Sequence, residues 1–260
     1  MVLTIDTGNT NVKFSFYDHG TFLKTLRTET VRDMTEDQFL ALIPVLFRDG
    51  GIDMKDIEGG IISSVVPQVS AALRPAIEKL TGLKFLMLGD NVETGLKFDM
   101  DAPETIGHDL LADAVAGLAI CEPPMVIFDT GTATTMQVLD KDGVYIGGLI
   151  IPGMRLSLNA LYQGCAQLPK LNFVDPPVFI GKNTVDSMHA GVVYGHAAMI
   201  DNLIERTERE LGMKVHVIAT GGLMPLILKH CEHDILFRGE LLTDGLLLLY
   251  EKNKARVGCA

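Results

Sequence analysis

The stretch that decides the fold is I-D-T-G-N-T-N-V-K-F-S-F-Y-D-H-G, residues 5–20, and the chain contains a second version of it. Residues 128–143 read F-D-T-G-T-A-T-T-M-Q-V-L-D-K-D-G, so Asp6-Thr7-Gly8 aligns without a gap on Asp129-Thr130-Gly131. Each copy begins with an apolar run that ends in an acid, and a Thr-Gly turn leads into a second apolar run. A polar turn and a third apolar run follow. A duplicated hairpin of this kind predicts two related domains.

The two Thr-Gly turns have the composition of a phosphate cradle. Gly8 and Gly131 can adopt backbone angles that are closed to other residues, and their missing side chains let the main chain approach a ligand closely. Thr, Asn and main-chain N–H groups around such a turn provide hydrogen-bond donors for phosphate. A single D-x-G-x-T is more simply a hairpin turn. Two copies in register, each opening one half of the chain, favour two turns that face one nucleotide.

Composition and charge exclude several classes of protein. The 260 residues are 47% hydrophobic, enough for sizeable cores, and the net charge of −11 provides no basic stripe for nucleic acid. The longest apolar runs are too short to span a bilayer, and Met1 leads directly into a predicted strand without a signal region. Cys121, Cys165, Cys231 and Cys259 are scattered, as expected of free, mostly buried thiols in a reducing compartment. We therefore expect a cytoplasmic protein with neither a nucleic-acid nor a membrane partner.

The order of the predicted elements is of the α/β type. Thr35 and Gln38 have the spacing of a capping box at the start of the first helix. Pro123-Pro124 marks a plausible junction, so the predicted domains are residues 1–121 and 122–260. The predicted strands are 2–5, 12–17, 22–27, 61–66, 85–88, 125–128, 134–139 and 215–218, and the predicted helices begin near Thr35, Gln68, Gly107, Gly153, Thr184 and Thr243.

The helix that begins at Gly107-His108 carries the first candidate catalytic residue, Asp109. Apolar residues at helical spacing, from Leu110 to Leu118, give this helix one buried face. Asp109 lies in the first turn, where an acid complements the helix dipole, and it could equally be a general base held near the phosphate cradle. His108 is more simply a solvated or capping residue than a metal ligand, because no His or Cys lies at a partner spacing.

In the second half, Pro152-Gly153 ends a strand and begins a helix whose Met154, Leu158 and Leu161 are expected in the core. After a loop over residues 169–183, Thr184 is predicted to be the N-cap of a long helix. A hydroxyl at that place could also bind a substrate, and the two roles are compatible. The segment T-G-G-L that follows strand 215–218 is a further glycine-rich turn.

Familiar nucleotide and hydrolase signatures are absent from the sequence: G-x-x-x-x-G-K-[ST], G-x-G-x-x-G after a strand, G-x-S-x-G and H-E-x-x-H. What remains is a duplicated α/β chain with two acid-glycine phosphate turns. That pattern resembles the superfamily of acetate and sugar kinases, heat-shock chaperones and actin. We therefore expect two duplicated ribonuclease H-like (actin/sugar kinase-type) domains, each with a mixed sheet flanked by helices.

Within that superfamily, six motifs in order resemble the type III pantothenate kinase family, and the resemblance covers essentially the whole chain. They are D-T-G-N-T-N (6–11), I-S-S-V-V-P (62–67), P-E-T-I-G-H-D (103–109), D-T-G-T-A-T-T (129–135) with G-G-L-I-I-P-G (147–153), G-K-N-T (181–184) and A-T-G-G (219–222).

The resemblance implies ATP-dependent phosphorylation of pantothenate to 4'-phosphopantothenate, the first step of coenzyme A biosynthesis, by a homodimer. Asp109 would accept the proton of the primary hydroxyl. Asp6 would act through Mg²⁺, and Asp129 would bind a monovalent cation, K⁺ or NH₄⁺. The implied ATP-binding residues are Asp6, Thr7, Gly8, Asn9, Thr10, Asn11, Val12, Lys13 and Thr132. The implied substrate-binding residues are Met100, Gly107, His108, Asp109, Leu110 and Thr184.

The chain departs from the family pattern at two substrate positions. Leu110 stands where the family usually has Arg in G-x-D-R, and Met100 stands where a Tyr is common. An Arg would provide a planar cationic fork for the carboxylate of pantothenate. Lys182 or a cation from a partner subunit is a candidate replacement. Two alternatives therefore stay open: a regulatory protein that acts as a transcriptional accessory factor, and a kinase for another small hydroxylated substrate.

Overall fold

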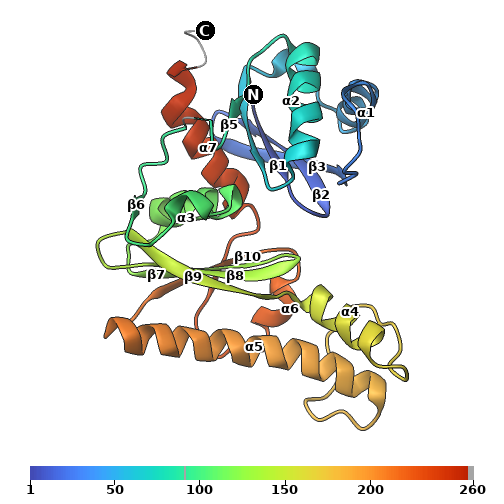
Figure 1. Ribbon diagram of the computed structural model, residues 1–260, viewed down its shortest axis with the longest axis vertical. Helices are drawn as coiled ribbons and strands as arrows, with labels where there is room; N and C mark the ends of the chain where they lie inside the picture. The colour runs from blue at the N-terminus through green and yellow to red at the C-terminus, as the bar shows by residue number, and fades with distance from the viewer. Residues whose placement is uncertain (91, 257–260) are drawn as a thin grey trace. The chain divides into compact units, whose positions relative to one another are not determined.

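The computed structural model describes residues 1–90 and 92–256, and Cys259 lies outside them (Figure 1). The chain forms two compact units. Of the described residues, unit 1 comprises 1–90, 92–96, 102–116 and 241–256, and unit 2 comprises 97–101 and 117–240. The domain boundary between residues 121 and 122 stays a prediction.

Unit 1 contains a five-stranded sheet in the order β3-β2-β1-β4-β5. β1 pairs antiparallel with β2 and parallel with β4, so the sheet is mixed. Its strands are β1 (Val2–Thr7), β2 (Asn11–Asp18), β3 (Thr21–Glu29), β4 (Gly59–Ser64) and β5 (Leu86–Met87). Its helical segments are α1 (Glu36–Asp49), η1 (Met54–Asp56), α2 (Pro67–Thr81), η2 (Pro103–Thr105), the first part of α3 (His108–Ile120), α7 (Leu241–Asn253) and η3 (Lys254–Arg256).

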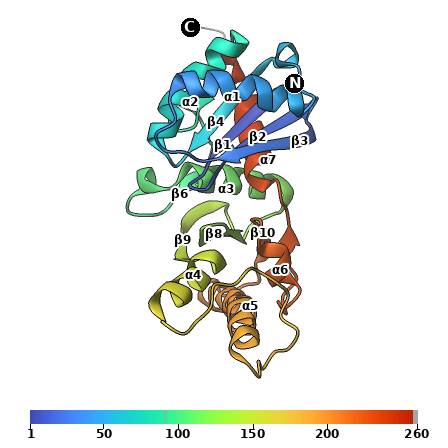
Figure 2. The ribbon, with the colours of Figure 1, turned by 90° about the vertical axis from the view of Figure 1, so that its right-hand side faces the viewer.

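Helices cover both faces of this sheet, because alternate residues of its central strands are apolar on each side. One face carries Leu3 and Ile5 of β1 and packs against α1 and α2 (Figure 2). The opposite face carries Val2 and Ile61 and packs against α7 and the start of α3. Tyr17 anchors α7 there, since its hydroxyl lies 2.8 Å from Thr243 Oγ1 and 2.7 Å from Asp244 Oδ1.

Unit 2 repeats this topology. Its sheet has the order β11-β10-β7-β8-β9-β6, in which β9-β8-β7-β10-β11 reproduces the order and the pairing directions of β3-β2-β1-β4-β5. The fold prediction of a duplicated, mixed α/β architecture is therefore confirmed. The strands are β6 (Lys97–Phe98), β7 (Met125–Thr130), β8 (Ala133–Leu139), β9 (Val144–Pro152), β10 (His216–Thr220) and β11 (Leu236–Phe237), and the helices are α4 (Met154–Gly164), α5 (Thr184–Leu211), α6 (Met224–Leu228) and the last residues of α3.

The two hairpins differ by one residue at their turns. Thr7 pairs with Val12, whereas Thr130 pairs with Thr134, so the second turn is shorter. Both hairpins continue into a third strand through an irregular register, at Phe16/Tyr17 and at Val138/Leu139. The gapless sequence alignment therefore matches β1 to β7, but it places β2 one residue out of register with β8.

The core of unit 2 lies between its sheet and helices α4, α5 and α6. Met154 and Leu158 are buried in it as predicted, but Leu161 is 39% exposed, so the prediction for that residue is wrong. Leu161 lies in the last turn of the short helix α4, where it lines a cavity. The expectation of mostly buried thiols is also wrong, because Cys165 is exposed and Cys121 and Cys231 are only partly buried.

Most predicted elements are present within a few residues of their expected limits. α1 has the predicted capping box, with Thr35 as N-cap and Gln38 as its partner. Pro67 occupies the first position of α2, where its missing N–H costs nothing. Within residues 1–90 and 92–256, no helix combines the length and the apolar character that crossing a membrane would require.

Candidate active site

A buried carboxylate marks the end of β1 in unit 1. Asp6 is 6% exposed and pairs across the hairpin with Lys13, whose Nζ lies 3.1 Å from Asp6 Oδ2. Burial raises the pKa of the Asp6 carboxyl, and the Lys13 ammonium opposes this shift by stabilising the charged form. The carboxylate of Asp109 adds to the rise in the pKa of Asp6, so both acids act in one electrostatic neighbourhood.

Asp109 occupies the first turn of α3 and is partly buried. Its Oδ1 accepts a hydrogen bond of 3.0 Å from the N–H of Leu110. Gly107 leaves room for this carboxylate, because a Cβ at that position would collide with Asp109 Oδ1. The side chain is therefore held at the helix start, close enough to Asp6 to contribute to the rise in its pKa.

The first Thr-Gly turn is fixed by one backbone hydrogen bond within it and by the side chain of Thr30, which follows β3. The Gly8 N–H donates to the Asn11 carbonyl at 3.0 Å, and Thr30 Oγ1 donates to the Gly8 carbonyl at 2.7 Å. Asn9 and Thr10 are exposed at the tip. These bonds shape the turn, and its tip is the part that a phosphate can reach.

Neither turn glycine uses the wider range of backbone angles that glycine can adopt. Neither Gly8 nor Gly131 belongs to the residues with positive φ, so their backbone angles are open to other residues. A Cβ would meet Asn11 O at 3.4 Å in the first turn and Ala133 O at 3.7 Å in the second, both ordinary contacts. The glycines therefore matter through the space that they leave above the turn.

Two buried hydroxyls lie at the carboxyl ends of the central strands. Thr7 Oγ1 and Ser63 Oγ have no hydrogen-bond partner among the residues that the structure describes. Ser63 stands beside Asp6 in the register of β1 and β4. An unsatisfied buried hydroxyl costs about 1–3 kcal/mol, so bound water or ligand at this edge would stabilise the unit. Sequence reasoning missed Ser63, whose signal was a polar residue inside the apolar run I-I-S-S-V-V.

Three glycine-containing segments of unit 2 meet at the second Thr-Gly turn. The Gly131 N–H donates to Ala133 O at 2.9 Å, and the Gly153 N–H donates to Thr132 O at 3.2 Å. Gly221 has a φ of +104°, and a Cβ there would lie 2.5 Å from the carbonyl oxygen of Thr130. This close approach explains why the segments around residues 153 and 221 contain glycine.

The predicted ion- and nucleotide-binding residues of unit 2 lie at this turn. Asp129 is partly buried near the end of the otherwise buried strand β7, and Thr132 is exposed at the turn. Thr130 Oγ1 donates to the carbonyl of Thr220 at 3.0 Å, which ties the turn to the end of β10. Asp129 and the main-chain carbonyls of Thr130 and Thr220 thus lie at the carboxyl ends of β7 and β10.

Thr184 is the first residue of α5 and not its N-cap, so that prediction is wrong. The cap is Asn183, whose Oδ1 accepts a hydrogen bond of 2.9 Å from the Asp186 N–H. Thr184 is exposed and lines a cavity of about 900 Å³ together with Lys182, Ser187 and His196. Because capping does not use its hydroxyl, Thr184 is available for a ligand.

The remaining substrate positions fall in both units. Gly107, His108, Asp109 and Leu110 belong to unit 1, where Asp109 shares its surroundings with Asp6. Met100 is partly buried in the short segment 97–101 of unit 2, next to β6.

The residues at Asp6 fit a magnesium ion that arrives with a nucleotide. Mg²⁺ prefers oxygen ligands and is commonly held by one or two carboxylates together with substrate phosphates. The described residues contain no group of three or more His, Cys, Asp or Glu side chains that could form a protein-only metal site. Asp6 and Asp109 provide carboxylate oxygens, and the unpartnered Ser63 hydroxyl lies beside Asp6.

Comparison with known proteins decides the family. The family model for type III pantothenate kinase matches residues 2–206. A type III pantothenate kinase of an Exiguobacterium species is 39% identical over 254 residues, which cover 98% of this chain and 100% of that protein. This chain belongs to the type III pantothenate kinase family.

Solved structures with low sequence identity share the fold of this type III pantothenate kinase family member. A Campylobacter jejuni protein described as a conserved Baf family transcriptional activator has a TM-score of 0.62 at 18% identity, with 97% of this chain and 99% of that chain covered. An activator of 2-hydroxyisocaproyl-CoA dehydratase from Clostridium difficile, solved with bound ADPNP, has a TM-score of 0.58 at 12% identity, with 98% and 96% covered. At such identities the likeness concerns the fold alone.

Proposed function

We propose that this protein transfers the γ-phosphoryl group of ATP to the primary hydroxyl of pantothenate, which forms 4'-phosphopantothenate in the first step of coenzyme A biosynthesis. Membership of the type III pantothenate kinase family supports this function. The structural observation that carries it is the placement of two acids in unit 1, buried Asp6 near the end of β1 beside the first Thr-Gly turn and Asp109 in the first turn of α3.

Asp109 is proposed as the proton acceptor for the attacking hydroxyl. Phosphoryl transfer depends mainly on positioning and charge neutralisation, so the base does not need unusual basicity. The hydrogen bond from the Leu110 N–H to Oδ1 fixes the carboxylate and leaves Oδ2 for the substrate. The start of α3 thus orients the group that receives the proton.

Asp6 and Lys13 are proposed to bind the phosphate end of ATP, with the exposed tip of the turn at Asn9 and Thr10. Mg²⁺ bound at Asp6 would neutralise charge on the transferring phosphates. Lys13 already neutralises part of the Asp6 charge, and its side chain is 41% exposed, so it can also reach a phosphate oxygen. In unit 2 we propose Thr132 for ATP and Asp129 for a monovalent cation, K⁺ or NH₄⁺.

The protein is proposed to act as a homodimer in the cytoplasm. Ile150, Phe179 and Ile180 of unit 2 are 80%, 68% and 75% exposed, an uncommon degree for large apolar side chains. Exposed apolar patches commonly mark protein–protein contacts. A second copy of the chain would remove these side chains from water.

The test compares two helix-start acids. Asp109→Asn removes the proposed base, whereas Asp37→Asn removes an exposed first-turn acid of α1 that lies outside the site. Pantothenate-dependent release of ADP is measured with ATP and Mg²⁺, in K⁺ and in Na⁺. We expect a loss of kcat of about 100-fold or more for Asp109→Asn and none for Asp37→Asn. Equal rates in the two variants would show that Asp109 only complements the helix dipole of α3 and is not the base.

A further inference from the structure

A second cavity, of about 460 Å³, belongs to unit 1 and lies at the carboxyl ends of two parallel strands. Ser64 at the end of β4, Met87 at the end of β5 and residues of α2 form its walls. In open α/β sheets, ligands bind outside the carboxyl ends of the strands. Its volume is in the range of pockets that hold small organic molecules.

This cavity adjoins the proposed catalytic residues. His108, which immediately precedes Asp109, forms part of the wall. The His108 ring lies against the backbone at Gly89, because a Cβ there would be 2.5 Å from its Cε1. Ser64 pairs with Thr7, the residue after Asp6. A ligand in this cavity would therefore lie beside the start of α3.

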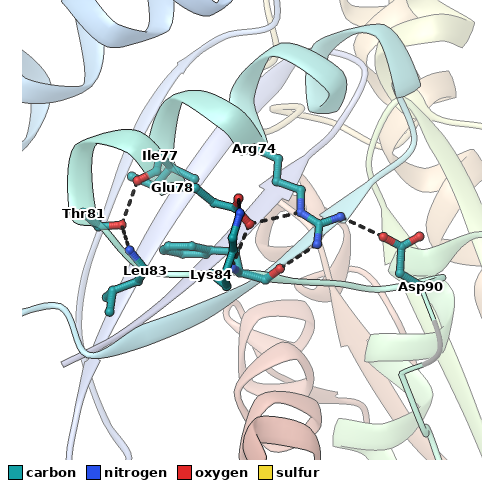
Figure 3. A network of polar contacts seen from close by, with 8 residues as sticks. Arg74, Ile77, Glu78, Thr81, Leu83, Lys84 and Asp90 are labelled. Atoms are coloured by element: carbon teal, nitrogen blue, oxygen red, sulfur yellow. Dashed lines mark hydrogen bonds and ion pairs between the residues drawn. The ribbon is translucent and has the colours of Figure 1, made fainter. Parts of the chain in front are cut away.

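Arg74 is the one Lys or Arg among the described residues that line the cavity. Two nitrogens of its guanidinium group are held by neighbouring residues: Nε lies 3.4 Å from Glu78 Oε1, and Nη2 lies 3.1 Å from the Phe85 carbonyl oxygen. Glu78 is fixed in turn by Lys84 Nζ at 2.7 Å. The orientation of the Arg74 fork is thus set by groups that are themselves anchored (Figure 3).

The third partner of Arg74 is an exposed carboxylate. Nη1 of Arg74 lies 2.8 Å from Asp90 Oδ2, and the Asp90 side chain is 60% exposed, whereas that of Glu78 is 15% exposed. Figure 3 shows Arg74 between these two acids. Ion pairs at exposed sites contribute little to stability, so Asp90 can be exchanged for another carboxylate at small cost.

The substrate of the proposed function carries one carboxylate, at the end opposite to the hydroxyl that is phosphorylated. Position 110, next to the proposed base, holds Leu110 and provides no cation. A planar guanidinium group is the side chain best suited to a carboxylate. We propose that Arg74 binds the carboxylate of the acyl substrate, and that this carboxylate replaces Asp90 on Nη1. The assignment rests on the proposed function and makes Arg74 the residue that selects acidic over neutral acceptors.

The experiment uses two acceptors with the same reacting hydroxyl: pantothenate, and its neutral N-methyl amide. Arg74→Gln is expected to raise KM for pantothenate at least ten-fold, which corresponds to about 1.4 kcal/mol, with kcat nearly unchanged. KM for the neutral amide should not change. Arg48→Gln, which removes an exposed Arg of α1 paired with Asp49, should alter neither value.

Asp90→Asn provides an independent variant that leaves the anchors of Arg74 intact. It should lower KM for pantothenate several-fold at low ionic strength, because the competing carboxylate is gone, and leave KM for the amide unchanged. The inference is overturned if Arg74→Gln raises KM for both acceptors equally or for neither, or if Asp90→Asn leaves KM for pantothenate unchanged. Failure of the wild-type protein to phosphorylate either acceptor would instead overturn the proposed function, and the inference with it.

Discussion

Removal of the Lys13 ammonium should destabilise the protein in a pH-dependent way. In Lys13→Met, the buried Asp6 carboxylate loses the partner whose Nζ lies 3.1 Å from Oδ2. At an effective dielectric constant of about 20, two charges at that distance attract each other by about 5 kcal/mol. The Lys13 side chain is 41% exposed, so solvent screens much of this energy. We expect a loss of about 2 kcal/mol at pH 8, between the values typical of exposed and buried pairs.

The direction of the pH dependence follows from the pKa of Asp6. Burial already raises this pKa in the wild-type protein, and Lys13 opposes the rise. Without Lys13 the folded-state pKa rises further above the unfolded value. The variant is therefore least affected at acidic pH, where the Asp6 carboxyl is neutral. The loss of stability grows as pH increases from the folded-state pKa of Asp6 in the wild-type protein to the higher folded-state pKa in the variant.

The assay is urea unfolding followed by circular dichroism, at several pH values from 5 to 8, because the chain contains no Trp. Asp6→Asn combined with Lys13→Met should abolish the pH dependence, since no charge is left to bury. Lys24→Met is the matched control on the same sheet, because Lys24 Nζ donates to the Gly50 carbonyl and not to an acid. A loss in Lys13→Met that is the same at every pH would refute the reasoning.

Three further predictions concern unit 2. Gly153→Ala places a Cβ against the carbonyl oxygens of Gly131 and Thr132, so it should weaken ATP binding at least ten-fold. The Kd is measured by calorimetry, and an unchanged value would show that this turn does not contact the nucleotide. Asn183→Ala should lower the free energy of unfolding by about 1 kcal/mol through loss of the α5 cap. Thr184→Val should leave the melting temperature unchanged and raise KM for pantothenate. A loss of stability in Thr184→Val and none in Asn183→Ala would show that Thr184 is the cap. Ile180→Asp should convert a dimer into monomers in light scattering, and a dimer that persists would locate the contact elsewhere.

The fold could be predicted from the sequence because its signal is local and occurs twice. Each hairpin is recognised in the sequence by an apolar run, an acid, a Thr-Gly turn and a second apolar run. Both sheets are ordered around these hairpins. The second face of the unit 1 sheet was not predictable in the same way. It is covered by α7, and the Tyr17–Thr243 hydrogen bond joins residues 226 positions apart, a contact that no sequence pattern specifies.

The errors at the site come from features that a sequence pattern resolves poorly. Asn183 and Thr184 are both competent caps, and hydrophobic periodicity does not decide between neighbours. The backbone angles of Gly8 and Gly131 depend on the turn geometry, which is set by bonds such as the one from Thr30 to Gly8. Arg74 and Asp90 are 16 residues apart, so their ion pair becomes visible only in the folded chain.

The central claim is that the chain phosphorylates pantothenate, and the most direct measurement is phosphorus NMR of a reaction that contains the protein, ATP, Mg²⁺, K⁺ and pantothenate. We predict a new phosphomonoester signal coupled to the protons of the primary carbinol carbon, at a rate that depends on pantothenate. Absence of that signal while ATP binds, or ADP release that is indifferent to pantothenate, would contradict the claim.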